Sequence, residues 1–245
     1  MKKIILIATA IAIMELLHGC TSQASETQET TTNIKQYNIC LVLDGTDRLS
    51  EQNGVPQVTV EEIKELSDLL SAKGVGTLYV SYVDNNCDNN NVVIFEWGKT
   101  RPDDIGRKPD YMMMSEYKNQ KEDCKAKQDE YDDCRDSTVT AFSKECVTIL
   151  EAAYSDFVAK QKNGSDVNGA INQAIRMLQA SEDGSSTSYI ILVSDGCDNV
   201  GKELQPIPDN TELIVVNTNV TKHQYGDLVS REFVNLQQAM KYIFK

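Results

Sequence analysis

The sequence predicts a three-layer, doubly wound α/β domain, in which helices cover both faces of a mostly parallel sheet with one antiparallel edge strand. Two stretches predict the sheet, residues 37–49 and 188–199, because each holds a short, nearly unbroken apolar run that ends in an Asp-Gly pair. Such a run is typical of a strand that is buried on both faces of a parallel sheet. Between these stretches, apolar residues recur at spacings of three and four, which is typical of amphipathic helices.

Residues 1–20 have the composition of a secretory signal, with two lysines followed by an apolar run that is too short to cross a bilayer. The signal ends in Leu-His-Gly-Cys, which resembles the lipobox of bacterial lipoproteins and implies cleavage before Cys20 and acylation of that residue. Cleavage of a plain signal peptide is the alternative. Residues 21–34 are mostly polar and are predicted to form a disordered tether. Residues 35–245 have the length of a single α/β core with an insertion.

The first half of the domain carries clear start and stop signals. Its first helix begins at a capping box of Thr59 and Glu62, and Gly74 ends it. Strands are predicted over 76–83 and 92–97. The turn between them is so short that the two strands must pair antiparallel.

Residues 99–137 interrupt this alternation of strands and helices. They are dense in Asp, Glu, Lys and Tyr and poor in aliphatic residues, and they contain two cysteines. We expect a partly helical, polar insertion on the surface of the domain. The elements that follow are a helix over 140–160, a helix after Gly164-Ser165-Asp166, a strand ending at Asp195, strands at 213–216 and 233–234, and a closing helix that Asn235 caps.

The two Asp-Gly pairs place Asp44 and Asp195 just after predicted strands. Ligands of open α/β sheets bind beyond the carboxyl ends of the strands, at the point where the strand order reverses. We therefore expect both carboxylates to face one crevice. Each pair taken alone is also ordinary turn chemistry, so the alternative is that the pairs only make turns.

The order of these elements resembles the von Willebrand factor type A (vWA) domain: a strand ending in Asp-x-Thr, a helix, an antiparallel strand pair, a Gly-Ser loop before a helix, and a strand ending in ILVSDG. The resemblance covers residues 35–245 except the insertion. It implies a metal-ion-dependent adhesion site for Mg²⁺ or another divalent cation, because hydroxyl and carboxylate oxygens suit such hard ions. The implied metal ligands are Asp44, Thr46, Ser165 and Asp195, and the implied ligand-binding neighbours are Asp47, Arg48 and Asp198.

Arg48 stands where the family has a second serine, and its guanidinium keeps its positive charge near neutral pH. Two outcomes remain open. Either Arg48 turns outward and a weakened metal site survives, or it pairs with Asp44 or Asp195 and takes the place of the ion. Asp47 offers a replacement oxygen in the first case. We expect little heat or thermal shift when Mg²⁺ or Mn²⁺ is added.

Catalytic motifs are sparse. Residues 43–46, Leu-Asp-Gly-Thr, are similar to the motif of haloacid dehalogenase-type phosphohydrolases, but Val42 occupies the position of the nucleophilic aspartate and carries no carboxylate. The sequence has no Gly-rich phosphate loop, zinc-spaced cysteine pair or HExxH helix. We therefore expect a binding module and not an enzyme, with a degenerate phosphohydrolase as the less favoured alternative.

The charge of the chain indicates the kind of partner. Lys and Arg total 24 against 37 Asp and Glu, a formal net charge of -13. This disfavours nucleic acid or an anionic bilayer surface as the main partner and favours cations or basic protein surfaces. We expect a lipoprotein of the cell envelope, in the outer membrane, that mediates protein–protein interaction or adhesion. The competing interpretation is a structural envelope component whose site is vestigial and whose contacts lie on the insertion.

Six cysteines besides Cys20 are an even number, as expected in an oxidising compartment. Cys87 and Cys197 follow strands at the same edge of the sheet, so they are candidates for a disulfide. Cys124 and Cys134 are a second candidate pair. On one straight helix they would lie about 15 Å apart, beyond the reach of a disulfide, so pairing them requires a bend.

Overall fold

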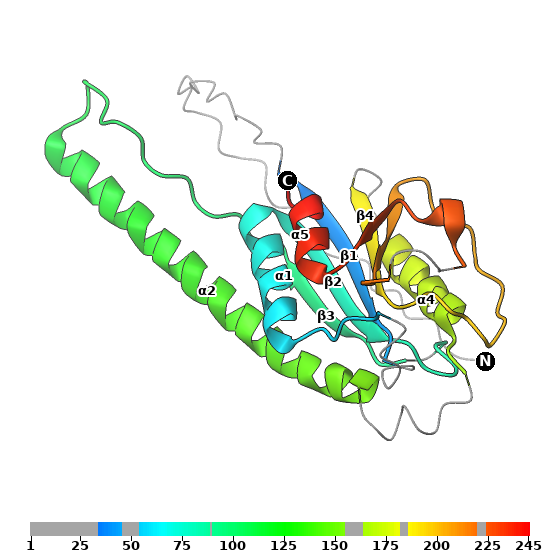
Figure 1. The fold of residues 1–245 in the computed structure, drawn as a ribbon. Coiled ribbons are helices and arrows are strands. Elements are labelled where there is room, and N and C mark those ends of the chain that lie inside the picture. Colours follow the sequence, from blue (N-terminus) through cyan, green and yellow to red (C-terminus); the bar gives the residue numbers. More distant parts are fainter. Residues whose placement is uncertain (1–33, 46–53, 89, 155–163, 182–185, 220–223) are drawn as a thin grey trace, which may run out of the picture. The chain divides into compact units, whose positions relative to one another are not determined.

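A computed structural model describes most of the domain (Figure 1). The described residues are 34–45, 54–88, 90–154, 164–181, 186–219 and 224–245. The predicted signal, Cys20 and the tether up to Asn33 lie outside them. No helix in the described part of the chain is both long and apolar enough to cross a membrane.

The described residues form a six-stranded sheet in the order β3-β2-β1-β4-β5-β6. Neighbouring strands are parallel except β2 and β3, which pair antiparallel at one edge. The prediction of an α/β fold with a mostly parallel sheet and one antiparallel edge strand is confirmed. The strands are β1 Gln36–Leu43, β2 Val75–Tyr82, β3 Val93–Trp97, β4 Thr187–Val193, β5 Thr211–Val216 and β6 Arg231–Phe233.

The side chains of β1 alternate between two hydrophobic clusters, one on each face of the sheet. Ile39 and Leu41 belong to the first cluster, while Cys40 and Val42 belong to the second, and all four are fully buried. A strand with apolar residues on both faces must be covered on both sides, so it reads as a continuous apolar run in the sequence. Cys40 is therefore a small core residue.

Helices cover the two faces unequally (Figure 1). Helices α1 (Val60–Lys73), α2 (Met114–Tyr154) and α5 (Leu236–Ile243) contribute to the first cluster, and α4 (Val167–Ala180) contributes to the second. Their caps follow the sequence signals. Thr59 and Glu62 form the predicted capping box, Asn235 caps α5, and the side chain of Asp166 accepts a hydrogen bond from the backbone N–H of Gly169 at the start of α4.

The predicted insertion over residues 99–137 is not confirmed, and the prediction of a new helix that begins near residue 140 is wrong. One helix, α2, runs from Met114 to Tyr154 and crosses that boundary without a break. The sequence holds no Gly or Pro between these residues, and it is rich in Lys, Glu and Gln, which favour helix. The apolar stripe lies in the second half of α2, which packs on the core. The first half of the helix is polar and extends away from the core.

Candidate functional site

The strand order reverses between β1 and β4. The chain places β2 and β3 on one side of β1, and β5 and β6 on the other side of β4. In open α/β sheets, the crevice beyond the carboxyl ends of two such strands is where ligands bind. Asp44 directly follows β1, and Ser194 and Asp195 directly follow β4, so the candidate carboxylates do follow neighbouring strands at the same edge.

Asp44 is anchored at this edge of the sheet, which we call the crevice, by the strand beside it. Its side chain is only 5% exposed, its Oδ2 accepts a hydrogen bond of 2.6 Å from Ser194 Oγ, and its backbone N–H donates to the Val193 carbonyl at 2.9 Å. Ser194 Oγ in turn accepts from the Gly196 N–H at 2.9 Å. Because Leu43 pairs with Val193, the residue opposite Asp44 is Ser194, and Asp195 lies one residue beyond.

The loop after β4 connects this anchor to the start of α4. Within the loop, Asp195 Oδ1 accepts from the Cys197 N–H at 2.9 Å. Asn199 then holds Ser165, since its Oδ1 accepts from the Ser165 N–H at 2.6 Å and its N–H donates to the Ser165 carbonyl at 3.2 Å. Asp44, Asp195 and Ser165 are thus joined through one hydrogen-bonded loop.

Asp198 acts inside this loop. Its Oδ1 accepts from the Asn168 N–H in the first turn of α4 at 3.1 Å, and its Oδ2 accepts from the Gly201 N–H at 2.8 Å. Both oxygens are therefore engaged by the backbone, and Asp198 positions the loop against the helix. Thr46, Asp47 and Arg48, the remaining predicted site residues, lie outside the described residues.

Asp166, which the sequence presents only as part of a loop before a helix, is fully buried at the start of α4. Its Oδ1 accepts from the Gly169 N–H, and its Oδ2 accepts from the Cys87 N–H at 2.9 Å and from Lys202 Nζ at 2.7 Å. Lys202 Nζ also meets Asp88 Oδ2 at 3.0 Å. These contacts tie the loop after β2, the start of α4 and the segment after β4 together.

The pKa of Lys202 reflects this arrangement. Burial acts to lower it, but the hydrogen bonds with Asp166 and Asp88 outweigh that effect and leave the pKa raised. The ammonium is therefore charged across the neutral range, as a partner of a fully buried carboxylate must be.

Tyr225 is a further site residue that no sequence motif indicates. It is 5% exposed, and its hydroxyl donates to Asn168 Oδ1 at 3.0 Å. Burial raises the pKa of the phenol, and the negative charges of Asp198 and Asp44 raise it further. Tyr225 therefore stays neutral beside the crevice. Its neighbour His223 lies outside the described residues.

The described donors match only part of a metal site. Asp44, Ser165 and Asp195 offer the oxygen types that Mg²⁺ accepts, but Mg²⁺ requires near-octahedral coordination. One oxygen of each carboxylate is already engaged, by Ser194 or by the Cys197 N–H. Among the residues that the structure describes, no group of three His, Cys, Asp or Glu side chains is placed to hold a metal ion.

None of the six described cysteines is in a disulfide, so neither predicted pairing is formed. Cys87 is buried, and its Sγ accepts from the Asp84 N–H at 3.1 Å, whereas Cys197 is exposed. Cys124 and Cys134 lie ten residues apart on the uninterrupted helix α2, which lacks the bend that their pairing requires.

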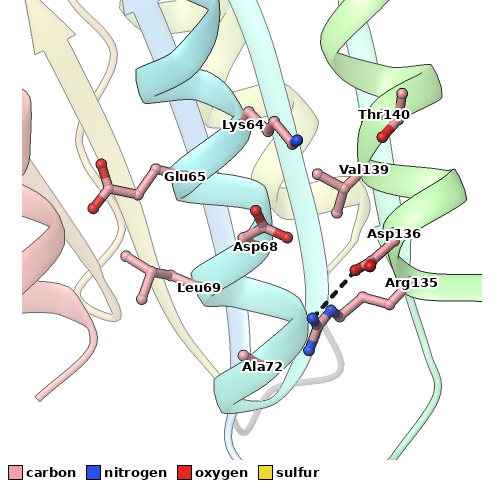
Figure 2. Close-up of a pocket in the computed structure, with 9 residues that line it drawn as sticks. All are labelled: Lys64, Glu65, Asp68, Leu69, Ala72, Arg135, Asp136, Val139 and Thr140. Atoms are coloured by element: carbon pink, nitrogen blue, oxygen red, sulfur yellow. Dashed lines mark hydrogen bonds and ion pairs between the residues drawn. The ribbon is translucent and has the colours of Figure 1, made fainter. Parts of the chain in front are cut away.

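A separate hollow of about 500 Å³ lies between α1 and α2 (Figure 2). It runs along α1 from Lys64 to Ala72, on the face of the sheet that α1 and α2 cover. Arg135 donates to Asp136 Oδ1 at 3.2 Å, but its buried Nε has no acceptor. The lining residues are Lys64, Glu65, Asp68, Leu69, Ala72, Arg135, Asp136, Val139 and Thr140.

Asp68, which lines this hollow, has a pKa that is shifted by its surroundings. Burial raises the pKa of its carboxyl group, and the charges of Arg135 and Lys64 offset that effect only partly. A raised pKa means that ionisation of Asp68 destabilises the fold above that pKa, and that the penalty disappears as the pH falls through it. We therefore expect Asp68→Asn to raise the melting temperature at pH 7, with a smaller gain in acid.

Asp129→Asn is the matched control, because Asp129 is exposed on α2 outside the hollow and the substitution changes the charge by the same amount. It is expected to leave the melting temperature nearly unchanged. A lower melting temperature for Asp68→Asn at pH 7 would mean that attraction to Arg135 and Lys64 exceeds the cost of burial. Differential scanning calorimetry at several pH values measures both variants.

No protein-family model matches the chain, and no curated protein is significantly similar to it in sequence.

Proposed function

We propose that this chain is a lipid-anchored protein of the bacterial cell envelope, in the outer membrane, whose vWA-like domain binds a protein ligand without catalysing a reaction. The observation that carries the proposal is the group of hydrogen-bonded carboxylate and hydroxyl side chains at the point of strand reversal. There Asp44, anchored by Ser194, and Asp195 follow neighbouring strands, and the loop after β4 links them to Ser165.

The chemistry of the crevice supports binding over catalysis. Val42, at the position of a phosphohydrolase nucleophile, is fully buried in the cluster beneath α4 and carries no reactive group. The carboxylates present are already held by serine and backbone donors, which fixes their positions but leaves them acceptors only. Fixed acceptors suit recognition of a donor-rich, positively charged surface.

The kind of partner follows from charge. Asp44, Asp195 and Asp198 gather acidic groups at one edge of the sheet of a chain whose formal net charge is -13. A complementary partner presents Lys or Arg to this edge, because opposite potentials steer association and fix its register. A divalent cation shared between the crevice and an acidic partner is the alternative that the vWA resemblance implies.

Affinity capture tests the proposal. The mature chain is immobilised and exposed to envelope extract of the source organism, once with a chelator and once with Mg²⁺. We expect the same partner in both, and a loss of roughly tenfold or more for Asp195→Asn, the size expected when a central interface charge is removed.

Asp209→Asn serves as the matched control, because Asp209 is exposed and precedes β5, at the opposite end of the strands. It removes the same charge and is expected to keep full recovery. Equal recovery by Asp195→Asn would refute binding at the crevice. Recovery only with Mg²⁺ would establish the metal-dependent alternative.

A further inference from the structure

The first part of α2 extends beyond the core. The first buried residue of this helix is Gln128, so the residues from Met114 onward form about 21 Å of helix with no buried side chain. Figure 1 shows this part running past the edge of the sheet, accompanied by the segment that precedes the helix. We call residues 101–127 the arm.

Hydrogen bonds hold the two halves of the arm together and join its base to the rest of α2. Gln128 Nε2 donates to the Pro102 carbonyl at 3.0 Å, and Cys124 Sγ donates to the Asp103 carbonyl at 3.1 Å. Farther out, the hydroxyl of Tyr117 donates to the Gly106 carbonyl at 3.0 Å. The segment before α2 is therefore bonded along the first part of the helix, and the end of the arm is fixed relative to the helix.

The end of the arm, residues 107–118, is what we call the tip, and its turn is closed by Lys108. The Nζ of Lys108 donates to the carbonyls of Pro109 at 3.0 Å and Met112 at 2.8 Å, and the Met112 N–H donates to the Pro109 carbonyl at 3.1 Å. A turn closed by three hydrogen bonds has already lost much of its conformational entropy, which lowers the cost of ordering it against a partner.

Three large apolar side chains project from this turn. Tyr111 is 88% exposed, Met113 is 72% exposed and Met114 is 57% exposed. The first two are the most exposed large apolar side chains in the described part of the chain. A contiguous group of this kind, at the end of a projecting element, marks a binding surface, unlike the scattered apolar residues of an ordinary protein surface.

Basic residues flank the apolar group. The tip, residues 107–118, contains three basic and two acidic side chains, although the whole chain has a formal net charge of -13. The sequence disfavours an anionic bilayer surface because of that overall charge, whereas contact depends on the local charge within a Debye length, about 8 Å in physiological salt. The basic side chains of the tip are Arg107, Lys108 and Lys118.

We propose that the tip inserts into the interface of an anionic phospholipid bilayer. Tyr111, Met113 and Met114 would enter the boundary between headgroups and acyl chains, where tyrosine is favoured, and the flanking basic side chains would meet the phosphates. A bilayer interface can accommodate a projecting apolar tip without a preformed groove. This inference is independent of the crevice, because it uses none of its residues.

Vesicle binding tests this inference. The protein is the mature chain with Cys20→Ser, which carries no acyl group, and its described domain is a compact unit separate from residues 1–33. It is sedimented with vesicles of phosphatidylglycerol and phosphatidylcholine, or of phosphatidylcholine alone. We expect stronger binding to the anionic vesicles that weakens with salt, and a loss of roughly tenfold or more when Tyr111, Met113 and Met114 are all replaced by Ser.

Val200→Ser with Leu228→Ser is the matched control, because both residues are exposed apolar residues outside the arm. This control, and the crevice variant Asp195→Asn, are expected to bind vesicles as the parent chain does. A fluorescence blue shift of a Trp placed at Tyr111 would report insertion directly. Equal binding by the tip variant, or no vesicle binding at all, would overturn the inference, and the latter result would favour an acidic protein cleft as the occupant.

Discussion

Replacing Asp166 by Ala is expected to lower the free energy of unfolding by about 2–4 kcal/mol, because it removes a fully buried carboxylate that caps α4 and accepts from two backbone donors. The Asp166 side chain is 0% exposed, and its carboxylate accepts from the Gly169 N–H, the Cys87 N–H and Lys202 Nζ. Its removal leaves the ammonium without its closest partner and leaves two backbone donors unsatisfied. Urea denaturation followed by circular dichroism measures the change.

Asp88→Ala is the matched control for this prediction. It removes the other carboxylate that contacts Lys202, but that side chain is 53% exposed, so we expect a loss of about 1 kcal/mol or less. Comparable losses for the two variants would mean that Asp166 is not the main partner of the ammonium. Since Ser165 precedes Asp166, Asp166→Ala is expected to disturb the crevice as well.

The pH dependence of this contact follows from the raised pKa of Lys202. A group whose pKa is higher in the folded state stabilises the fold fully below its ordinary pKa and loses this contribution as the pH rises through the folded value. The difference in stability between the parent chain and Lys202→Met is therefore expected to be constant near neutrality and to shrink only in strongly alkaline solution. A difference that changes between about pH 6 and pH 8 would contradict the assignment.

Local signals in the sequence were sufficient for the sheet and the helix starts. The apolar run of β1 is buried on both faces, and the capping box at Thr59 and the cap at Asn235 are present as expected. The two Asp-Gly pairs require glycine for different reasons. Gly196 adopts a φ of 70°, which favours glycine, whereas a Cβ at Gly45 would collide with the carbonyl of Ala153 on α2.

Contacts between distant segments were beyond the reach of the sequence. Lys202 bonds to Asp166, and Tyr225 bonds to Asn168, across 36 and 57 positions, and neither pair belongs to a periodic pattern. Ser194 lies inside the ILVSDG run, yet its role depends on the strand register that sets it opposite Asp44. Such residues can be identified only when the fold and its strand register are known.

The length of α2 was misjudged because polar composition was taken as a sign of a separate insertion. Composition determines whether a segment is buried, but the absence of Gly and Pro determines whether a helix can continue. The segment from Met114 to Gln128 is polar and still helical, because it extends from the part of α2 that packs on the core.

Blocking Cys197 with a bulky maleimide tests most directly whether the partner binds at the crevice. Cys197 follows the Asp195 turn and is exposed, whereas Cys40, Cys87 and Cys146 are buried. With Cys20→Ser, Cys124→Ser and Cys134→Ser in place, Cys197 is the most accessible cysteine of the described chain. A chain that instead retains Cys124 and carries Cys197→Ser places the same label on the arm and serves as the control.

We expect the label on Cys197 to remove nearly all recovery of the partner from envelope extract, while the same label on Cys124 leaves recovery unchanged. Undiminished recovery with a fully labelled Cys197, or a loss that follows the label on Cys124, would contradict the account.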